Sequence, residues 1–238
     1  MLKAIIFDAD HTLYKVVTKN AYAKMFDYIS KETGINREAF ERAWKNCVKE
    51  ILNSKDAQST EKRSREYSLR IVISQFGVGK GISEKAIKNA LDIFRKQVLT
   101  DLEYEKDAKK TIAALQKKYT LAIASDECEP FLEMKLNRVF GKWRKYFKFI
   151  VSCETAGELK PSENYFKIAL DKLKIPPQEA VVAGDSIERD ITPAKKLGIK
   201  TVLISENNTD KAADFTIKSL SELGSALAKV IYCEFKEV

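Results

Sequence analysis

The sequence predicts an α/β protein with a doubly wound, mostly parallel sheet and an inserted all-helical domain. The short apolar run Leu2–Phe7 is typical of a buried strand. Residues 17–99, which follow it, show only helical periodicity. After residue 100, short apolar runs alternate with helical segments, as in parallel strands joined by helices. We therefore expect a discontinuous α/β domain, residues 1–16 and 100–238, interrupted by a helical domain, residues 17–99.

The inserted region contains four helical segments, and each begins with a residue type that often caps a helix. Gly34 follows the first segment and is typical of a C-terminal cap. Four helices with no strand between them are expected to form a small bundle. The segments are 18–34, 36–54, 59–77 and 83–99.

Between residues 100 and 238, short apolar runs typical of strands alternate with segments of helical periodicity. Strands are expected at 120–125, 149–152, 180–185, 200–205 and 214–217. Helices are expected at 107–119, 130–140, 162–173, 188–198 and 220–232. With Leu2–Phe7, these strands would form the sheet of the α/β domain.

The composition excludes several classes of protein. The hydrophobic share of 45% and charged share of 32% are those of a folded globular chain, and no run reaches the roughly 20 apolar residues of a membrane span. Lys3 lies within the short first apolar run, which argues against a signal peptide, so cytoplasm is the expected location. Four cysteines without a CxxC pair predict reduced, packed thiols. A single histidine, His11, excludes a multi-histidine metal site.

The net charge of +8 would suit an anionic substrate or nucleic acid. Lys and Glu alternate along the helical faces, and no aromatic-basic cluster appears. Nucleic-acid binding is therefore disfavoured, and a small anionic metabolite is the expected partner.

Polar residues follow several predicted strands at their carboxyl ends, which meet at one edge of an open parallel sheet. These residues are Asp8, Asp10, Ser125, Asp126, Lys160 and Asp185. Carboxylates gathered there would repel one another, and Mg²⁺ would relieve that repulsion. A cation, a lysine, a hydroxyl and free backbone amides together suit a phosphoryl group, which a carboxylate could attack.

Four motifs in this order resemble those of the haloacid dehalogenase-like superfamily. They are DADHT at 8–12, LAIASD at 121–126, LKPS at 159–162 and GDSIERDI at 184–191. Each motif is common by itself, but together, on successive predicted strand ends, they are specific. The helical insertion resembles the helical C1-type cap of that superfamily, without a residue-level signature.

The resemblance implies a role for each matching residue. Asp8 would be the nucleophile, and Asp10 the general acid and base. Thr12 would hold the loop geometry, Ser125 and its neighbour Asp126 would lie at the substrate phosphoryl group, and Lys160 would pair with Asp8. Mg²⁺ would be held by Asp8, the backbone carbonyl of Asp10, and Asp185, while Asp190 would orient Lys160 or a metal-bound water.

The implied activity is hydrolysis of a small phosphomonoester through an aspartyl-phosphate. A phosphomutase would need the same residues, and a phosphate-sensing module is a further alternative. A 2-haloacid dehalogenase shares the fold, but Asp10 argues against it, since halide departure needs no acid. His11 occupies a position where the family often has Gly, either as a structural variant or to touch substrate or cap. The sequence leaves the substrate and the oligomeric state open.

Overall fold

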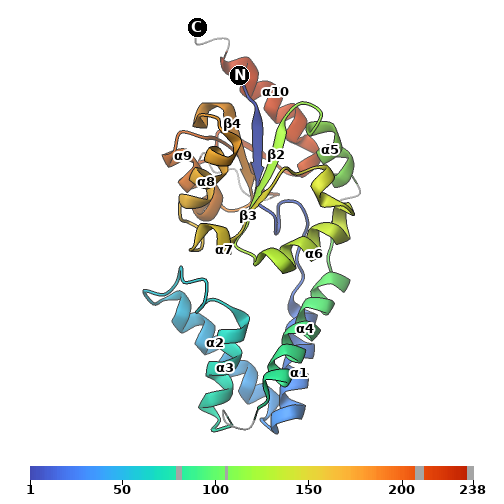
Figure 1. Cartoon of the computed structure of the whole chain (residues 1–238), viewed down its shortest axis with the longest axis vertical. Helices are drawn as coiled ribbons and strands as arrows, with labels where there is room; N and C mark the ends of the chain where they lie inside the picture. The colour runs from blue at the N-terminus through green and yellow to red at the C-terminus, as the bar shows by residue number, and fades with distance from the viewer. Residues whose placement is uncertain (79–81, 105–106, 207–211, 235–238) are drawn as a thin grey trace. The chain divides into compact units, whose positions relative to one another are not determined.

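A computed structural model describes the backbone of residues 1–78, 82–104, 107–206 and 212–234, with side chains to residue 229 (Figure 1). The chain divides into two compact units. The sheet unit comprises Met1–Lys15 and Glu103–Val238, and the helical unit comprises Val16–Leu102. Each is described by itself.

The sheet unit is built on six parallel strands in the order β3-β2-β1-β4-β5-β6. The strands are β1 (Ala4–Phe7), β2 (Thr120–Ala124), β3 (Ile150–Val151), β4 (Ala180–Gly184), β5 (Lys200–Ile204) and β6 (Phe215–Ile217). Every residue of β1 and β4 is buried, which explains why both read as continuous apolar runs without alternation. The predicted α/β fold with a mostly parallel sheet is confirmed.

The register of the central strands brings their carboxyl ends to one level. Phe7 pairs with Ile123 of β2 and with Ala183 of β4. The backbone amide of Asp8 then donates to the carbonyl of Ala183 at 2.9 Å. The residues that follow β1, β2 and β4 therefore leave the sheet side by side.

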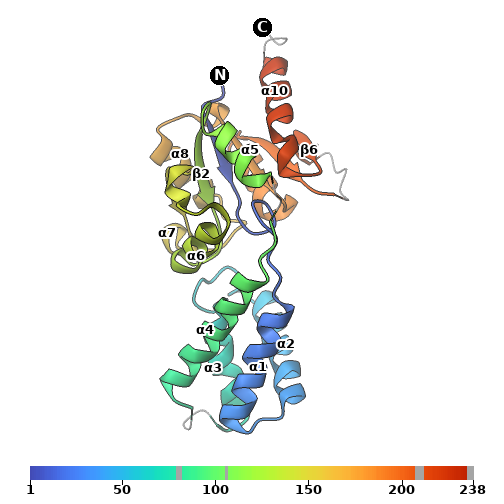
Figure 2. The same ribbon diagram turned by 90° about the vertical axis from the view of Figure 1, so that its right-hand side faces the viewer.

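Helices cover both faces of this sheet: α8 and α9 lie on one side, and α5 and α10 on the other (Figures 1 and 2). The helices of the unit are α5 (Ala108–Leu115), α6 (Glu129–Phe140), α7 (Cys153–Ala156), α8 (Asn164–Leu173), α9 (Thr192–Lys196) and α10 (Leu223–Glu234). Tyr165 and Phe166 of α8 pack with Ile6 and Val182 of the sheet in one buried cluster. This layering is the doubly wound arrangement that alternating strands and helices predict.

Two local features differ from the predicted elements. The helix expected at 188–198 is instead a π-helical turn, Ile187–Ile191, continued by α9. The single turn α7 was not predicted. The Ser152 side chain accepts a hydrogen bond from the Thr155 amide at its start, and left-handed Gly157 ends it.

The helical unit contains α1 (Lys19–Thr33), α2 (Arg37–Leu52), α3 (Arg65–Gln75) and α4 (Glu84–Thr100). Five aromatic rings from α1, α2 and α4 form its core, with centroid separations of 4.9 Å to 5.8 Å: Tyr22, Phe26, Phe40, Trp44 and Phe94. Ser64 caps α3, so this helix begins later than the expected segment 59–77. Thr18 makes no capping hydrogen bond, contrary to its predicted role.

Within the described ranges, no helix is long and apolar enough to cross a membrane. Cys47 and Cys153 are buried free thiols, as expected for packed cysteines. Cys128 is a free thiol too, but it is exposed, so its predicted packing is wrong.

Candidate active site

A buried lysine connects two carboxylates at the carboxyl edge of the sheet. Lys160 Nζ lies 2.7 Å from Asp8 Oδ1 and 2.6 Å from Asp190 Oδ1. The side chains of Lys160 and Asp190 are each only 2% exposed. Asp8 follows β1, and Asp190 belongs to the π-helical turn after β4, so the strand register brings them together.

The neighbouring charges offset the cost of burial for Lys160 but not for Asp8. Burial opposes the charge of Lys160, but the carboxylates of Asp190 and Asp8 outweigh it and raise the lysine pKa above its ordinary value. Burial also raises the pKa of Asp8, even though Lys160 acts in the opposite direction. Lys160 is therefore a permanent cation beside a carboxylate whose negative charge costs free energy.

Asp185 adds a third carboxylate, and carboxylate oxygens of Asp8, Asp185 and Asp190 lie within 4.8 Å of one another. Burial, together with the charges of Asp8 and Asp190, raises the pKa of Asp185 to about 7. One lysine thus faces three acidic groups. A hard divalent cation would relieve this excess of negative charge, and oxygen ligands are what Mg²⁺ prefers.

The position of Asp190 depends on close packing against Gly184. A Cβ atom built on Gly184 would lie 2.5 Å from Asp190 Oδ2 and 2.6 Å from Asp190 Cβ. The backbone amide of Ser186 donates to Asp190 Oδ2 at 3.1 Å. Both oxygens of Asp190 are therefore already engaged, one by this amide and one by Lys160.

Asp10, although two residues from Asp8, belongs to a different charge group. Both of its carboxylate oxygens accept hydrogen bonds from Lys135 Nζ, at 2.7 Å and 2.6 Å. Lys135 Nζ also donates to Glu127 Oε2 at 3.1 Å, and its side chain has no exposed surface. Lys135 was not predicted from the sequence as a site residue. The available signal was its place on the apolar face of α6, three residues after Leu132.

The loop that carries Asp10 folds back on itself. His11 has a positive φ of 67°, and its amide donates to the carbonyl of Tyr14 at 2.6 Å. The Tyr14 hydroxyl is buried, and burial together with the charge of Asp10 raises its pKa well above the ordinary value. His11 itself is exposed, whereas Thr12 is buried.

The remaining predicted residues lie on the neighbouring loops. Asp126 Oδ1 accepts from the backbone amide of Lys160 at 2.8 Å, and Arg189 pairs with the other oxygen of Asp126. Asp126 therefore ties together the loops that carry Ser125, Lys160 and Asp190. Ser125 is 2% exposed, and its hydroxyl accepts from the Glu127 amide at 3.3 Å. Among the described side chains, the buried Thr12 hydroxyl has no hydrogen-bond partner.

A cavity of about 420 Å³ lies within the sheet unit and reaches Asp185 and Thr12. Its lining includes His11, the basic side chains Lys15 and Lys218, and the acidic side chains Glu103 and Glu206. This volume falls within the usual range for small-molecule sites.

The chain was compared with known proteins. A family model described as haloacid dehalogenase-like hydrolase matches residues 5–204. A glyceraldehyde 3-phosphate phosphatase of Methanocaldococcus jannaschii is 27% identical, over 94% of this chain and 96% of the relative. A ribulose-1,5-bisphosphate 5-phosphatase of Halopiger xanaduensis is 25% identical, over 94% of this chain and 98% of the relative.

Solved structures agree on the fold. A 2-haloacid dehalogenase from Pseudomonas syringae aligns with a TM-score of 0.72 at 20% identity, over 96% of this chain and 99% of that chain. A HAD phosphatase from Thermococcus onnurineus aligns with a TM-score of 0.69 at 23% identity, over 95% of this chain and 98% of that chain. Since the family model covers most of the sequence, this chain belongs to the haloacid dehalogenase-like hydrolase family.

Proposed function

We propose that this protein is a Mg²⁺-dependent phosphatase that hydrolyses a small phosphomonoester through an aspartyl-phosphate on Asp8. The observation that carries the proposal is the Lys160 ammonium, held between Asp8 and Asp190 beside Asp185. A phosphoryl group needs nearby positive charge, and the nucleophile needs to lie within reach of that charge. The sheet unit would carry out the chemistry, and the helical unit would act as a cap.

The acidic group fits a magnesium ion, because three carboxylates face one lysine and burial raises the pKa of Asp185 to about 7. Asp8, the backbone carbonyl of Asp10, and Asp185 would hold Mg²⁺, which when bound would neutralise charge on the phosphoryl oxygens. Asp190 has both oxygens engaged by Lys160 and Ser186, so we assign it the orientation of Lys160.

Asp8 would use Oδ2 to attack phosphorus, since Oδ1 accepts the hydrogen bond from Lys160. The bond to the leaving oxygen breaks as the Oδ2–phosphorus bond forms. Lys160 and the Ser125 hydroxyl would hold the phosphoryl oxygens. The buried Thr12 would keep the loop between Asp8 and Tyr14 in place.

Asp10 would give a proton to the leaving alcohol and then take one from the water that hydrolyses the intermediate. Both Asp10 oxygens accept from Lys135 in this structure, so one of them must leave the lysine to reach the substrate. Asp126 would act beside the phosphoryl group by keeping the backbone of Lys160 in position.

The substrate class follows from the relatives rather than from the site alone. Two named relatives act on glyceraldehyde 3-phosphate and ribulose 1,5-bisphosphate, and a third, from Aquifex aeolicus, is a phosphoglycolate phosphatase. We assign this protein a small phosphorylated metabolite of the same kind. The cavity beside Asp185 has space for such a molecule.

The test is release of inorganic phosphate from an aryl phosphate, followed by a panel of phosphorylated metabolites, each with and without Mg²⁺. Asp8→Asn should show no turnover above background, and Asp10→Asn should lose about 10²–10⁴-fold in kcat. Asp171→Asn, an exposed change on α8, is the matched control and should retain wild-type turnover. Wild-type turnover by Asp8→Asn would show that the assigned nucleophile is wrong.

The same samples distinguish the other activities of this fold. A dehalogenase would release halide from a 2-haloacid, and a phosphomutase would return an isomeric sugar phosphate instead of inorganic phosphate. A phosphate-sensing module would bind phosphate without turning over any member of the panel. Each of these results would contradict the phosphatase assignment.

A further inference from the structure

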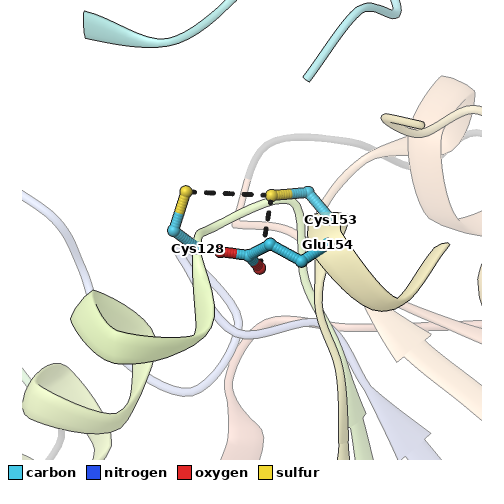
Figure 3. A group of neighbouring side chains, drawn as sticks. All are labelled: Cys128, Cys153 and Glu154. Atoms are coloured by element: carbon cyan, nitrogen blue, oxygen red, sulfur yellow. Dashed lines mark hydrogen bonds between the residues drawn. The ribbon is translucent and has the colours of Figure 1, made fainter. Parts of the chain in front are cut away.

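Two cysteines and a glutamate form a compact group after the ends of β2 and β3 (Figure 3). This group shares no residue with the acidic group around Lys160. Cys128 Sγ lies 3.9 Å from Cys153 Sγ, and Cys153 Sγ lies 3.6 Å from Glu154 Oε2. The three ligand atoms lie within 4.8 Å of one another. The mechanism proposed above uses none of these side chains.

These separations match a tetrahedral metal site. With metal–sulfur bonds of about 2.3 Å and a metal–oxygen bond of about 2.0–2.2 Å, tetrahedral angles put two sulfurs about 3.8 Å apart and sulfur and oxygen about 3.5–3.7 Å apart. The observed distances of 3.9 Å between the two sulfurs and 3.6 Å between sulfur and oxygen agree with these values. A disulfide needs a sulfur–sulfur bond of only about 2.05 Å, so the two thiols would have to approach much more closely.

The surrounding backbone holds the three groups toward a common point. Cys128 occupies the N-cap position of α6, but its side chain makes no capping hydrogen bond there. Its sulfur is directed toward Cys153 instead (Figure 3). Glu154 Oε2 accepts a hydrogen bond from the backbone amide of Glu129 at 3.1 Å, which fixes the carboxylate.

We propose that Cys128, Cys153 and Glu154 form a binding site for a soft divalent cation of the Zn²⁺ class, with a fourth position open to water. Two thiolates select Zn²⁺ or Co²⁺ over Mg²⁺, which prefers an all-oxygen shell. The site therefore differs in ligand chemistry from the carboxylates around Lys160. It does not depend on the proposed phosphatase activity.

Co²⁺ is the most direct probe, because thiolate-bound cobalt has a sulfur-to-metal charge-transfer absorption that an all-oxygen site does not produce. The reduced, full-length protein is titrated with CoCl₂ in excess Mg²⁺, so that the carboxylates around Lys160 hold Mg²⁺. We expect one Co²⁺ per chain with thiolate absorption, displaced by an equivalent of Zn²⁺. Equilibrium dialysis with Zn²⁺ alone measures the affinity independently of colour.

Single substitutions assign the ligands. Cys128→Ser and Cys153→Ser should each weaken Co²⁺ binding by at least about 100-fold, since loss of an outer partner alone typically costs 10–100-fold. Glu154→Gln should weaken binding at least about tenfold while the thiolate bands remain. Cys47→Ser, a buried cysteine of α2 in the helical unit, should bind as the wild type does. Circular dichroism confirms that each variant is folded.

Three results would overturn the proposal. The first is no thiolate absorption on addition of Co²⁺ to the reduced protein. The second is undiminished binding in both Cys128→Ser and Cys153→Ser. The third is a protein whose reduced form binds neither Co²⁺ nor Zn²⁺ and which forms a Cys128–Cys153 disulfide with peroxide as oxidant. That combination would mean that the two cysteines are a redox pair and not metal ligands.

Discussion

The ammonium group of Lys135 donates to both carboxylate oxygens of Asp10 from a side chain with no exposed surface. A lysine is buried so completely only when its charge is paired. Glu127 supplies the second partner at 3.1 Å. The residue assigned as general acid and base is therefore positioned by α6, an element that carries none of the four sequence motifs.

Replacing this lysine tests its role. Lys135→Met keeps most of the apolar side chain but leaves Asp10 and Glu127 without the cation that they share. Since removal of one partner from a buried ion pair is strongly destabilising, we expect a loss of about 3 kcal/mol in the free energy of unfolding, measured by urea denaturation. We also expect kcat to fall more than KM changes. Lys142→Met, an exposed lysine of the same unit, is the control. A folded Lys135→Met protein with wild-type kcat would contradict the positioning role.

The contrast between Asp185 and Lys135 shows what the sequence could predict. Asp185 directly follows the buried run Ala180–Gly184, and parallel topology alone brings such strand ends to one edge. The contact between Lys135 and Asp10 spans 125 residues and depends on how α6 packs against the loop after β1. No local pattern contains that packing.

The exact ends of some helices could not be predicted from the sequence either. The polar stretch before α3 contains two serines, and only the tertiary structure decides that Ser64 caps the helix. The turn at Ile187–Ile191 is π-helical, and it directs Asp190 back toward Gly184 and Lys160. An ordinary helical pattern in the sequence does not reveal this, although the motif GDSIERDI does contain both Gly184 and Asp190.

Gly184→Ala should disable the site without removing any of its charged groups. The new methyl group would lie 2.5 Å from Asp190 Oδ2, which is inside van der Waals contact, so the carboxylate must move. Displaced Asp190 can no longer hold Lys160 at 2.6 Å. We expect a fall of at least about 10²-fold in kcat, as for small misplacements of catalytic groups. Gly224→Ala, where a Cβ atom would have no other atom within 4 Å and the backbone is not left-handed, serves as a steric comparison. Equal kcat in Gly184→Ala and wild type would contradict this account.

The free energy of unfolding of the metal-free protein should fall as pH rises from about 4 to about 7. Burial and the neighbouring carboxylates raise the pKa of Asp185 from 3.8 to about 7, and the pKa of Asp8 is raised as well. The folded state therefore binds more protons than the unfolded state between about pH 4 and 7, so its stability falls as pH rises through this window. Thermal unfolding in EDTA at intervals from pH 5 to 8 measures the effect.

Mg²⁺ should reverse this loss, because a cation among the ionised carboxylates binds only the folded state. We expect the increase in Tm on adding Mg²⁺ to be larger at pH 8 than at pH 5. Asp185→Asn should reduce both the pH dependence in EDTA and the response to Mg²⁺. If the Mg²⁺ response of this variant matched that of the wild type at every pH, Asp185 would not be a metal ligand.

His11 provides a test of backbone strain inside the DADHT motif. Its φ of 67° lies in the left-handed region, where a residue with a Cβ atom costs roughly 1–2 kcal/mol and glycine does not. Glycine also has more conformational freedom to lose on folding, which offsets part of the gain. We therefore expect His11→Gly to be neutral or stabilising by up to about 1 kcal/mol, and His11→Val to be destabilising, because β-branched side chains tolerate this conformation poorly.

The turnover of His11→Gly distinguishes a role of His11 in backbone conformation from a contact of its side chain with substrate. His11 also lines the cavity next to Asp185, so a contact with substrate is the alternative role for this side chain. If backbone conformation is its only contribution, His11→Gly should keep kcat/KM within about twofold of the wild type. Such a change is much smaller than the tenfold change that corresponds to about 1.4 kcal/mol. A His11→Gly protein that is as stable as the wild type but raises KM tenfold or more would instead place the imidazole against the substrate. The kinetic comparison therefore decides between the two roles that the sequence left open for this residue.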